Sequence, residues 1–174
     1  MRVINKPYRP ETARMPADFP PASDTLVRDR AEADTSPVPS RNAPVFAALD
    51  LGTNNCRLLV ARPARRERGC EGFKVIDAFS RVVRLGEGVC SSGLLSPAAM
   101  DRTVEALRIC AQKMERRQVT SFRAVATEAC RRAANCTDFM ARVKDETGLD
   151  IEIIDTEEEA ALAVAGCVPL LDRD

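Results

Sequence analysis

Residues 45–61 read VFAALDLGTNNCRLLVA, two apolar runs separated by a short polar turn. The first run leads to the carboxylate of Asp50, the turn covers residues 52–55, and the second run covers residues 58–61. Apolar runs bounded by turn residues are typical of strands, so the pattern predicts two buried strands joined by a tight turn. We expect this hairpin to begin the folded part of the chain.

The turn of this hairpin has the composition of an anion-binding loop. Gly52 carries no Cβ, so the backbone can come close to a ligand. Hydroxyl and amide donors follow at Thr53, Asn54 and Asn55, and such donors suit a phosphate. The carboxylate of Asp50 can hold Mg²⁺ through water. An ordinary tight hairpin, in which glycine and asparagine are common, is the alternative.

Composition excludes several classes of function. The chain has 174 residues, with 26 basic and 26 acidic side chains, so no net charge attracts nucleic acid or an anionic membrane. Histidine is absent, which excludes a Ser-His-Asp triad and a His-ligated zinc site within this chain. The seven cysteines form no C-x-x-C pair, which indicates reduced thiols in a cytoplasmic protein. No apolar window approaches the length of a membrane span.

Residues 1–44 differ in composition from the rest. They hold many of the prolines, and their apolar side chains follow no period. Such a segment cannot bury enough surface to offset its ordering entropy, so we expect a disordered, proline-rich tail before a domain over residues 45–174. A docking tail and a mis-assigned start would both leave this pattern.

The stretch after the hairpin predicts one more strand and no dinucleotide site. Residues 62–69 contain four arginines, and we expect a solvated loop there, although a polyanion contact is the alternative. Residues 72–83 predict a third strand, which completes a meander. The glycines of residues 84–89, RLGEGV, do not match G-x-G-x-x-G, and no helix is expected directly after them.

Alternating helices and strands follow the meander. Ser96 and Pro97 open a helix whose apolar positions recur every three or four residues up to Met114. Strands are expected at residues 122–126 and 151–154, and a second helix at residues 137–147 with Gly148 as its C-cap. The strand–helix–strand order predicts a crossover into a parallel sheet and hence an α/β fold.

Two further stretches carry charged side chains at the ends of predicted strands. Residues 126–135, ATEACRRAAN, place Arg131 and Arg132 just after a strand, where either guanidinium can reach a phosphate. Residues 155–160, DTEEEA, open an apolar helix. Thr156 and Glu159 fit a capping box, which would give Glu159 a purely structural role.

Three motifs together make residues 45–170 resemble the N-terminal domain of the exopolyphosphatase and guanosine-pentaphosphate phosphohydrolase (Ppx/GppA) family. They are DLGTNN at residues 50–55, ATEACRRAAN at residues 126–135 and IIDTEEEA at residues 153–160, with RLGEGV in support. The resemblance implies an actin-like, ribonuclease-H-like fold, in agreement with the predicted meander and its alternating helices and strands.

The resemblance also implies roles for individual residues. It implies phosphate binding by Gly52, Thr53, Asn54, Asn55 and Arg131, and a Mg²⁺ ligand at Asp50. It implies that Glu159, preceded by Glu158, is the catalytic base for hydrolysis of polyphosphate or of guanosine pentaphosphate. Mg²⁺ is the implied cofactor, no specific nucleic acid or membrane partner is expected, and a homodimer of the full-length family member stays open.

The sequence departs from the family pattern at three places. Thr156 stands where the family usually has glycine, and Asn55 where Ser or Thr is frequent. The family's second phosphate loop, expected soon after Leu171, has no counterpart, so we expect a truncated domain that is inactive alone. A non-catalytic phosphate- or nucleotide-binding module or a truncated remnant is the alternative, and a sugar kinase is weaker because it does not need the E-E-A motif.

Overall fold

The computed structural model describes residues 43–65 and 71–171 of the chain. The expected tail therefore lies almost wholly outside the described residues. The strands and helices follow in the order β1 (Phe46–Leu51), β2 (Asn55–Arg65), β3 (Glu71–Val82), α1 (Val89–Ser92), α2 (Pro97–Arg116), β4 (Ser121–Ala126), α3 (Glu128–Arg132), α4 (Cys136–Thr147), β5 (Glu152–Ile153) and α5 (Thr156–Leu171).

The strands form one mixed sheet in the order β3-β2-β1-β4-β5. β1, β2 and β3 pair antiparallel as a meander, and β1–β4 and β4–β5 pair parallel. The meander, the crossover through α2 and the parallel strands confirm the predicted α/β fold of the actin-like, ribonuclease-H-like type. The carboxyl ends of β1 and β4 lie together, since the Thr127 N–H donates to the Leu51 carbonyl at 3.2 Å.

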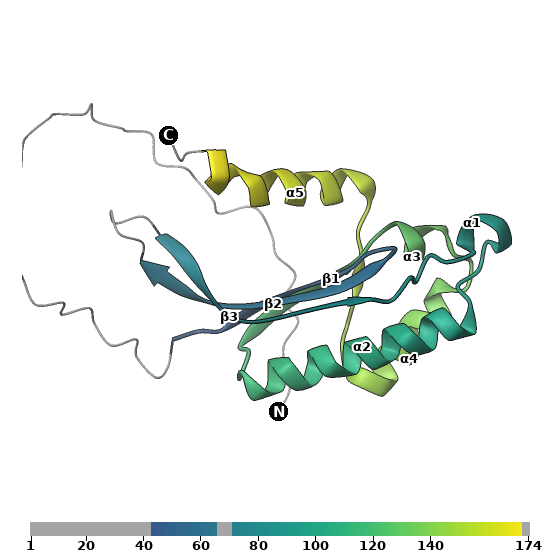
Figure 1. Ribbon diagram of the computed structural model, residues 1–174, viewed down its shortest axis with the longest axis horizontal. Coiled ribbons are helices and arrows are strands. Elements are labelled where there is room, and N and C mark those ends of the chain that lie inside the picture. Colours follow the sequence, from purple (N-terminus) through teal and green to yellow (C-terminus); the bar gives the residue numbers. More distant parts are fainter. Residues whose placement is uncertain (1–42, 66–70, 172–174) are drawn as a thin grey trace, which may run out of the picture.

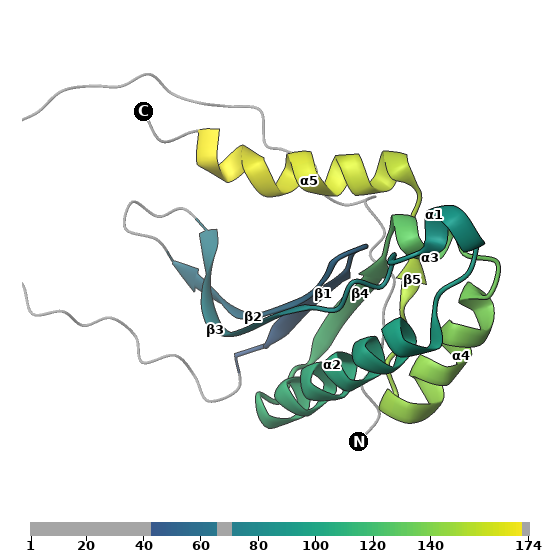
Figure 2. The same ribbon diagram turned by 45° about the vertical axis from the view of Figure 1, so that its right-hand side comes forward.

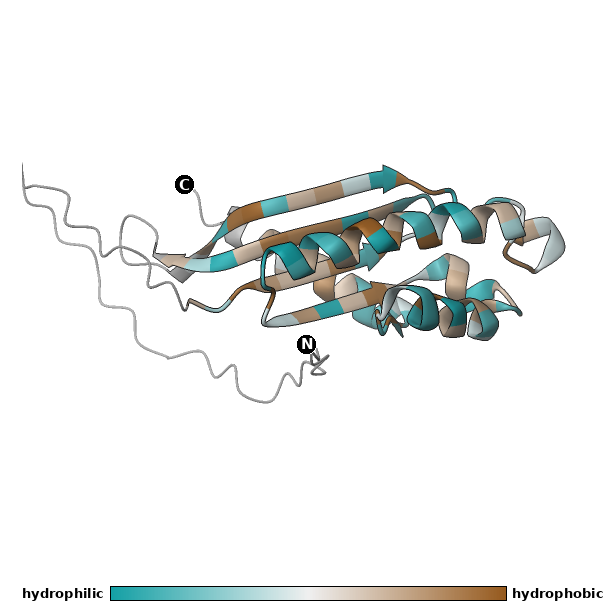
Figure 3. Ribbon diagram, turned by 90° about the horizontal axis from the view of Figure 1, so that it is seen from below, coloured by the Kyte–Doolittle hydropathy of each residue, from teal (hydrophilic) through white to brown (hydrophobic). Residues whose placement is uncertain are grey.

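One face of the sheet carries the hydrophobic core. α2 and α4 lie across this face (Figure 1 and Figure 3). Alternate residues of the strands point into this layer, and the largest fully buried side chains include Leu49, Val60, Leu107 and Phe139. α2 begins as predicted, with the Ala99 N–H donating to the Ser96 hydroxyl at 3.3 Å, and α4 ends at Gly148 with φ 72°. Local capping rules therefore placed both helix ends correctly.

The opposite face of the sheet lies beneath α5, which runs apart from the strands (Figure 1 and Figure 2). The prediction of two buried strands holds for one face only, because alternate side chains of β1 and β2 are exposed on the other. Phe46 stays 47% exposed and Leu59 37% exposed on the face toward α5. Among the described residues, no helix is long and apolar enough to cross a membrane.

Two expectations about loops are wrong. Arg62 and Pro63 belong to β2, which runs on to Arg65 and pairs with β3 through Pro63↔Phe73. β1 pairs with β2 only as far as Ala61, so beyond Ala61 β2 has a neighbouring strand, β3, on one side only. Proline has no backbone N–H, and on the unpaired side of β2 no interstrand hydrogen bond is lost. Directly after the glycines of RLGEGV a one-turn helix, α1, does begin at Val89, because Gly88 adopts φ 80° and turns the chain into it.

The described cysteines are free thiols, as predicted. Four of them are buried in the core region, at positions Cys56, Cys110, Cys130 and Cys136. Cys90 and Cys167 are exposed, and Cys70 lies outside the described residues. Cysteine acts at the four buried positions as a small apolar side chain.

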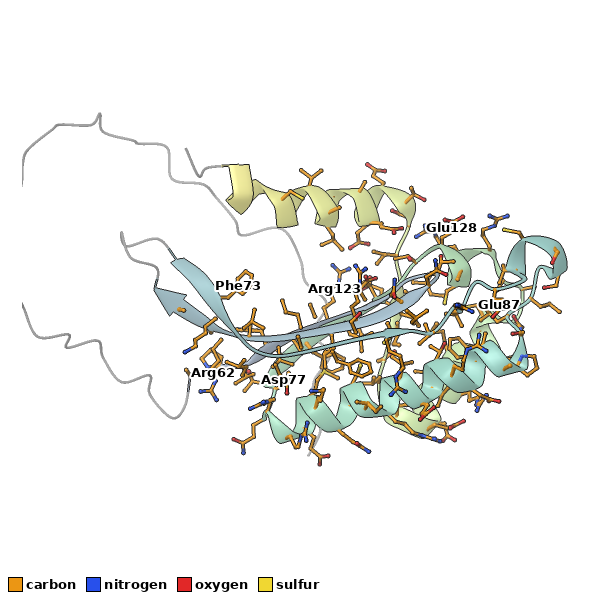
Figure 4. The ribbon with its side chains drawn as sticks, in the orientation of Figure 1. Arg62, Phe73, Asp77, Glu87, Arg123 and Glu128 are labelled. Atoms are coloured by element: carbon orange, nitrogen blue, oxygen red, sulfur yellow. The ribbon has the colours of Figure 1, made fainter. Side chains whose placement is uncertain are left out.

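Asp77 of β3 ties the sheet to the end of α2, on the side of the sheet that faces this helix (Figure 4). Its carboxylate accepts from Lys113 Nζ at 2.7 Å and from Arg117 Nε at 2.9 Å. These two hydrogen bonds lower the pKa of Asp77 to about 2. A carboxyl with a lowered pKa stabilises the fold above its unfolded pKa, and that contribution is lost as the pH falls through the folded value.

We therefore expect Asp77→Asn to lower the free energy of unfolding at pH 7 by on the order of 1 kcal/mol, a value reduced for solvent screening of partly exposed charges. The difference between wild type and variant should shrink below about pH 4 and vanish only below about pH 2, which urea unfolding at several pH values measures. Glu115→Gln, an exposed change on α2, is the control. A difference that is constant with pH would contradict the assignment to this ion pair.

Candidate phosphate-binding site

A hollow of about 700 Å³ lies between the outer face of the sheet and α5. Its apolar floor comes from side chains such as Ala48 and Val125, and its polar lining includes Asp50, Arg57, Arg123, Thr127 and Glu159. These polar residues come from β1, β2, β4, the β4–α3 junction and α5. The ends of the parallel strands thus bring together carboxylates and guanidinium groups from distant parts of the sequence.

Asp50 lies on the face of β1 that points into this hollow. Burial raises the pKa of the Asp50 carboxyl, the guanidinium of Arg57 acts in the opposite direction, and the negative charge of Glu159 raises the pKa further. Arg57 is the direct cross-strand partner of Asp50 in the β1–β2 hairpin. Two carboxylates that repel each other at the edge of a hollow make a favourable place for a cation.

The turn after Asp50 is fixed by a hydrogen bond within it and by hydrogen bonds to the segment that follows β3. The Gly52 N–H donates to the Asn55 carbonyl at 2.9 Å and closes the turn. The Asn54 carbonyl accepts from Val83 N–H at 2.8 Å and from Arg84 N–H at 3.0 Å. Within the described residues, the side chains of Thr53 and Asn54 are exposed and make no hydrogen bond, so they remain available to a ligand.

Gly86 of the RLGEGV segment packs closely against this turn. Its N–H donates to the Thr53 carbonyl at 3.0 Å. A Cβ at position 86 would lie 2.3 Å from Thr53 Cγ2 and 3.6 Å from the Cβ of Ala129 in α3. Glycine at position 86 therefore lets the turn and α3 approach each other without displacing the Thr53 side chain. A Cβ at Gly52, by contrast, would meet only the Asn55 carbonyl oxygen at 3.5 Å, an ordinary distance.

We expect Gly86→Ala to lower the free energy of unfolding by about 1 kcal/mol, because the exposed Thr53 side chain can rotate away at moderate cost. Thr53→Ser removes the atom that clashes, so the double variant Gly86→Ala/Thr53→Ser should regain most of the lost melting temperature. Calorimetry on the four proteins measures this coupling. Equal destabilisation by Gly86→Ala in both backgrounds would show that Thr53 is not the obstacle.

Arg131 of α3 forms an ion pair with Glu159, one of the residues that line the hollow. Arg131 Nη2 donates to Glu159 Oε2 at 2.9 Å, and Arg131 Nη1 donates to the Ile154 carbonyl at 2.7 Å. The side chain of Arg131 is 22% exposed and that of Glu159 44% exposed. A guanidinium held by two acceptors is fixed in orientation, and its remaining donors can bind an anion.

The capping box expected for Thr156 and Glu159 is absent from α5. Asp155 caps the helix instead: its Oδ1 accepts from the Glu158 N–H at 2.8 Å, and its carbonyl accepts from the Glu159 N–H at 3.1 Å. Asp155 directly precedes the first helical residue, which is the N-cap position, and its carboxylate accepts from a free N–H group of the first turn. The Thr156 hydroxyl lies one residue further on, already inside the helix. The Glu159 carboxylate is thus not used as a cap.

Glu159 lines two adjoining hollows. The second, of about 660 Å³, lies between α3 and α5 and includes Arg131 and Thr156. Asp50 lines the first hollow, Arg131 the second, and Glu159 both. The turn at residues 52–55 lines neither hollow, although it directly follows Asp50 and approaches α3 at Gly86. The structure therefore pairs Glu159 directly with Arg131, places Asp50 on the same hollow as Glu159, and leaves the turn beside Asp50.

Sequence reasoning missed two cations of this site, Arg57 and Arg123. A hairpin register drawn through the 52–55 turn pairs position 50 with position 57, which would have revealed Arg57. Arg123 alternates with the buried residues of β4, so the strand period places it on the face toward α5, as Figure 4 shows. Its partners, Glu152 and Glu158, have no local signal in the sequence.

Known proteins resemble this chain over most of its folded part. The model of the Ppx/GppA phosphatase family matches residues 64–173. A crystal structure of a Ppx/GppA family member from Aquifex aeolicus is 33% identical, with a TM-score of 0.60, and the match covers 67% of this chain and 36% of that one. An exopolyphosphatase from Cytophaga hutchinsonii is 27% identical, with a TM-score of 0.60 and coverage of 68% and 36%.

The chain thus spans about a third of the length of these structures. The matched residues contain the RLGEGV segment, the strand and helix that lead to Arg131, and the acidic start of α5. By this match, the chain belongs to the Ppx/GppA phosphatase family.

Proposed function

We propose that this site binds the terminal phosphate of polyphosphate or of guanosine pentaphosphate, as part of a hydrolase that cleaves the terminal phosphoanhydride. The pairing of Arg131 with Glu159, which lines the same hollow as Asp50, carries the proposal. A cation for a phosphoryl group and a carboxylate for water then lie within one hydrogen bond of each other. The exopolyphosphatase from Cytophaga hutchinsonii supports the substrate class.

Each residue has a defined part in this proposal. Arg131 neutralises charge on the phosphoryl group, and the Thr53 and Asn54 side chains donate hydrogen bonds beside it. The fold has room for a side chain at position 52, so packing does not explain the glycine there. Close approach of a ligand to the backbone would explain it. Glu159 accepts the proton of the attacking water as the new P–O bond forms and the bond to the leaving phosphate breaks.

The residues present fit a hydrated Mg²⁺ ion. Within the described residues, no three carboxylate or thiol side chains cluster as a metal cage. Mg²⁺ commonly keeps several waters and takes one or two protein carboxylates together with substrate phosphate oxygens. We propose Asp50 as its ligand in this chain, because burial and the charge of Glu159 already disfavour an unpaired carboxylate there. Bound Mg²⁺ would supply charge neutralisation for the phosphate oxygens.

A phosphoryl-transfer site holds substrate, ion and water from opposite sides, and this chain spans about a third of the structures it resembles. We therefore propose that residues 1–174 bind a polyphosphate but release no phosphate at a significant rate. Calorimetric titration with tripolyphosphate and Mg²⁺ tests binding, and phosphate release from polyphosphate and guanosine pentaphosphate tests turnover, each beside Glu159→Gln. Binding without turnover is expected.

Robust turnover that is abolished by Glu159→Gln would overturn the proposed inactivity and show that this chain is catalytically sufficient. Binding that survives removal of both Asp50 and Arg131 side chains would overturn the proposed site. An absence of any binding would favour a remnant without function over a phosphate-binding module.

A further inference from the structure

The first turn of α5 is held to α3 and to β4 by two separate ion pairs. Arg131 of α3 pairs with Glu159, and Arg123 of β4 pairs with the neighbouring Glu158, with 2.5 Å between Arg123 Nη2 and Glu158 Oε1. Arg123 also donates to Glu152 of β5, from Nη2 at 3.0 Å and from Nε at 3.2 Å. Arg123 therefore bridges the last strand of the sheet and the helix that carries Glu159.

The rest of α5 has little to hold it in the described structure. Each residue from position 160 to 167 is exposed, and Leu162 and Val164 are 39% and 66% exposed. Figure 1 and Figure 2 both show the helix apart from the strands beyond its first turn. The placement of Glu159 over the hollow thus depends on the first turn and on its two arginine partners.

The two arginines differ in whether a bound substrate phosphate would compete for their ion pairs with α5. Arg131 is the proposed phosphate ligand, so a bound phosphoryl group competes with Glu159 for its guanidinium. Arg123 has two carboxylate partners, and its side chain is 21% exposed at the base of the hollow. Its Nε and Nη2 groups already donate to Glu152 and Glu158, so it keeps its hold on α5 when Arg131 turns to the ligand.

We propose that Arg123 is a positioning residue, which keeps Glu159 over the site through Glu158 while Arg131 binds the substrate phosphate. The inference rests on the proposed function of Arg131 and Glu159. It gives Glu158, the first glutamate of the E-E-A motif, a separate part: Glu158 anchors the helix, and Glu159 acts on water.

The test measures amide hydrogen exchange over residues 156–167 in the 174-residue chain, without ligand and with saturating tripolyphosphate and Mg²⁺. Without ligand, Arg123→Gln and Arg131→Gln should each raise exchange less than about threefold, because the other pair still holds the turn. The double variant should raise exchange roughly tenfold or more. With ligand, wild type should stay protected, whereas Arg123→Gln alone should lose protection by roughly tenfold.

Three variants separate positioning from other roles. Glu158→Gln should reproduce the ligand-dependent loss, while Glu157→Gln, the same change on an exposed neighbour, should not. Arg123→Lys keeps a charge near Glu158 and should retain at least about half of the protection. The affinity for tripolyphosphate should change less than about threefold in every Arg123 variant, because Arg123 does not contact the ligand.

Specific outcomes would overturn the proposal. Exchange in the double variant that matches Arg131→Gln alone would show that Arg123 does not hold α5. Protection of α5 in ligand-bound Arg123→Gln, or a large loss of tripolyphosphate affinity in that variant, would do the same. If wild type binds no tripolyphosphate, the proposed function fails, and the ligand-free double variant still decides whether Arg123 positions the helix.

Discussion

Replacing Glu159 by glutamine is expected to lower the rate of phosphate release by about a hundredfold or more, while leaving substrate affinity nearly unchanged. Glutamine has the same shape and accepts a hydrogen bond from Arg131, but it cannot take a proton from water. The measurement uses a chimera in which residues 45–171 replace the matching part of the Cytophaga hutchinsonii exopolyphosphatase. Initial rates of phosphate release and the affinity for tripolyphosphate are then compared.

Glu157→Gln is the matched control for this change. It removes the same charge from the same turn of α5, and Glu157 makes no ion pair among the described residues. Its rate should stay within about threefold of the chimera, since only a weak interaction with the helix dipole is lost. Near-normal turnover in Glu159→Gln, together with a lower melting temperature, would mean that Glu159 serves the fold through Arg131 and has no part in the chemistry.

Removing the Arg131 guanidinium is expected to weaken tripolyphosphate binding by about ten- to a hundredfold in the 174-residue chain. A charged, oriented donor contributes more to phosphate binding than a neutral hydrogen bond. Arg131→Gln also removes the hydrogen bond to the Ile154 carbonyl and the ion pair with Glu159, so the melting temperature should fall by a few degrees. Calorimetric titration and thermal unfolding measure the two effects.

The neighbouring Arg132 distinguishes specific binding from a general effect of charge. Arg132 pairs with Glu128 within α3 and is half-exposed, with a side-chain exposure of 52%. The same substitution there should cost less than about threefold in affinity, as expected for a screened surface charge. An equal loss at both positions would show that tripolyphosphate responds to the net charge of α3, and the assignment of Arg131 as the phosphate ligand would then be wrong.

Local rules predicted much of this protein from its residues alone. The apolar runs around Asp50 predicted the β1–β2 hairpin, Ser96 and Pro97 marked the start of α2, and Gly148 marked the end of α4. Each of these features depends on side chains within a few positions of one another. The motifs around positions 50, 131 and 159 also indicated the family, since they recur in order along the chain.

Two of the wrong predictions, which concern Pro63 and the faces of β1 and β2, fall on features that depend on neighbours distant in the sequence. Pro63 lies in a strand because β3 pairs with it on one side and β1 ends before reaching it. β1 and β2 remain half-exposed because α5 covers the second face without packing closely against it. A hydropathy pattern predicts that a strand is apolar. Whether one or both faces of that strand are buried depends on where helices later in the chain lie.

The amino-acid sequence predicts the order of most strands and helices, the turn chemistry after Asp50, and the residue types available to a phosphate. Which of these residues meet depends on the packing of the chain: Arg131 with Glu159 across 28 positions, Arg123 with Glu152 and Glu158, and Gly86 with Thr53. Such pairs form because the packed sheet and helices bring their backbones together first. An ion pair between partly exposed groups contributes only about 1 kcal/mol, too little to dictate the fold that creates it.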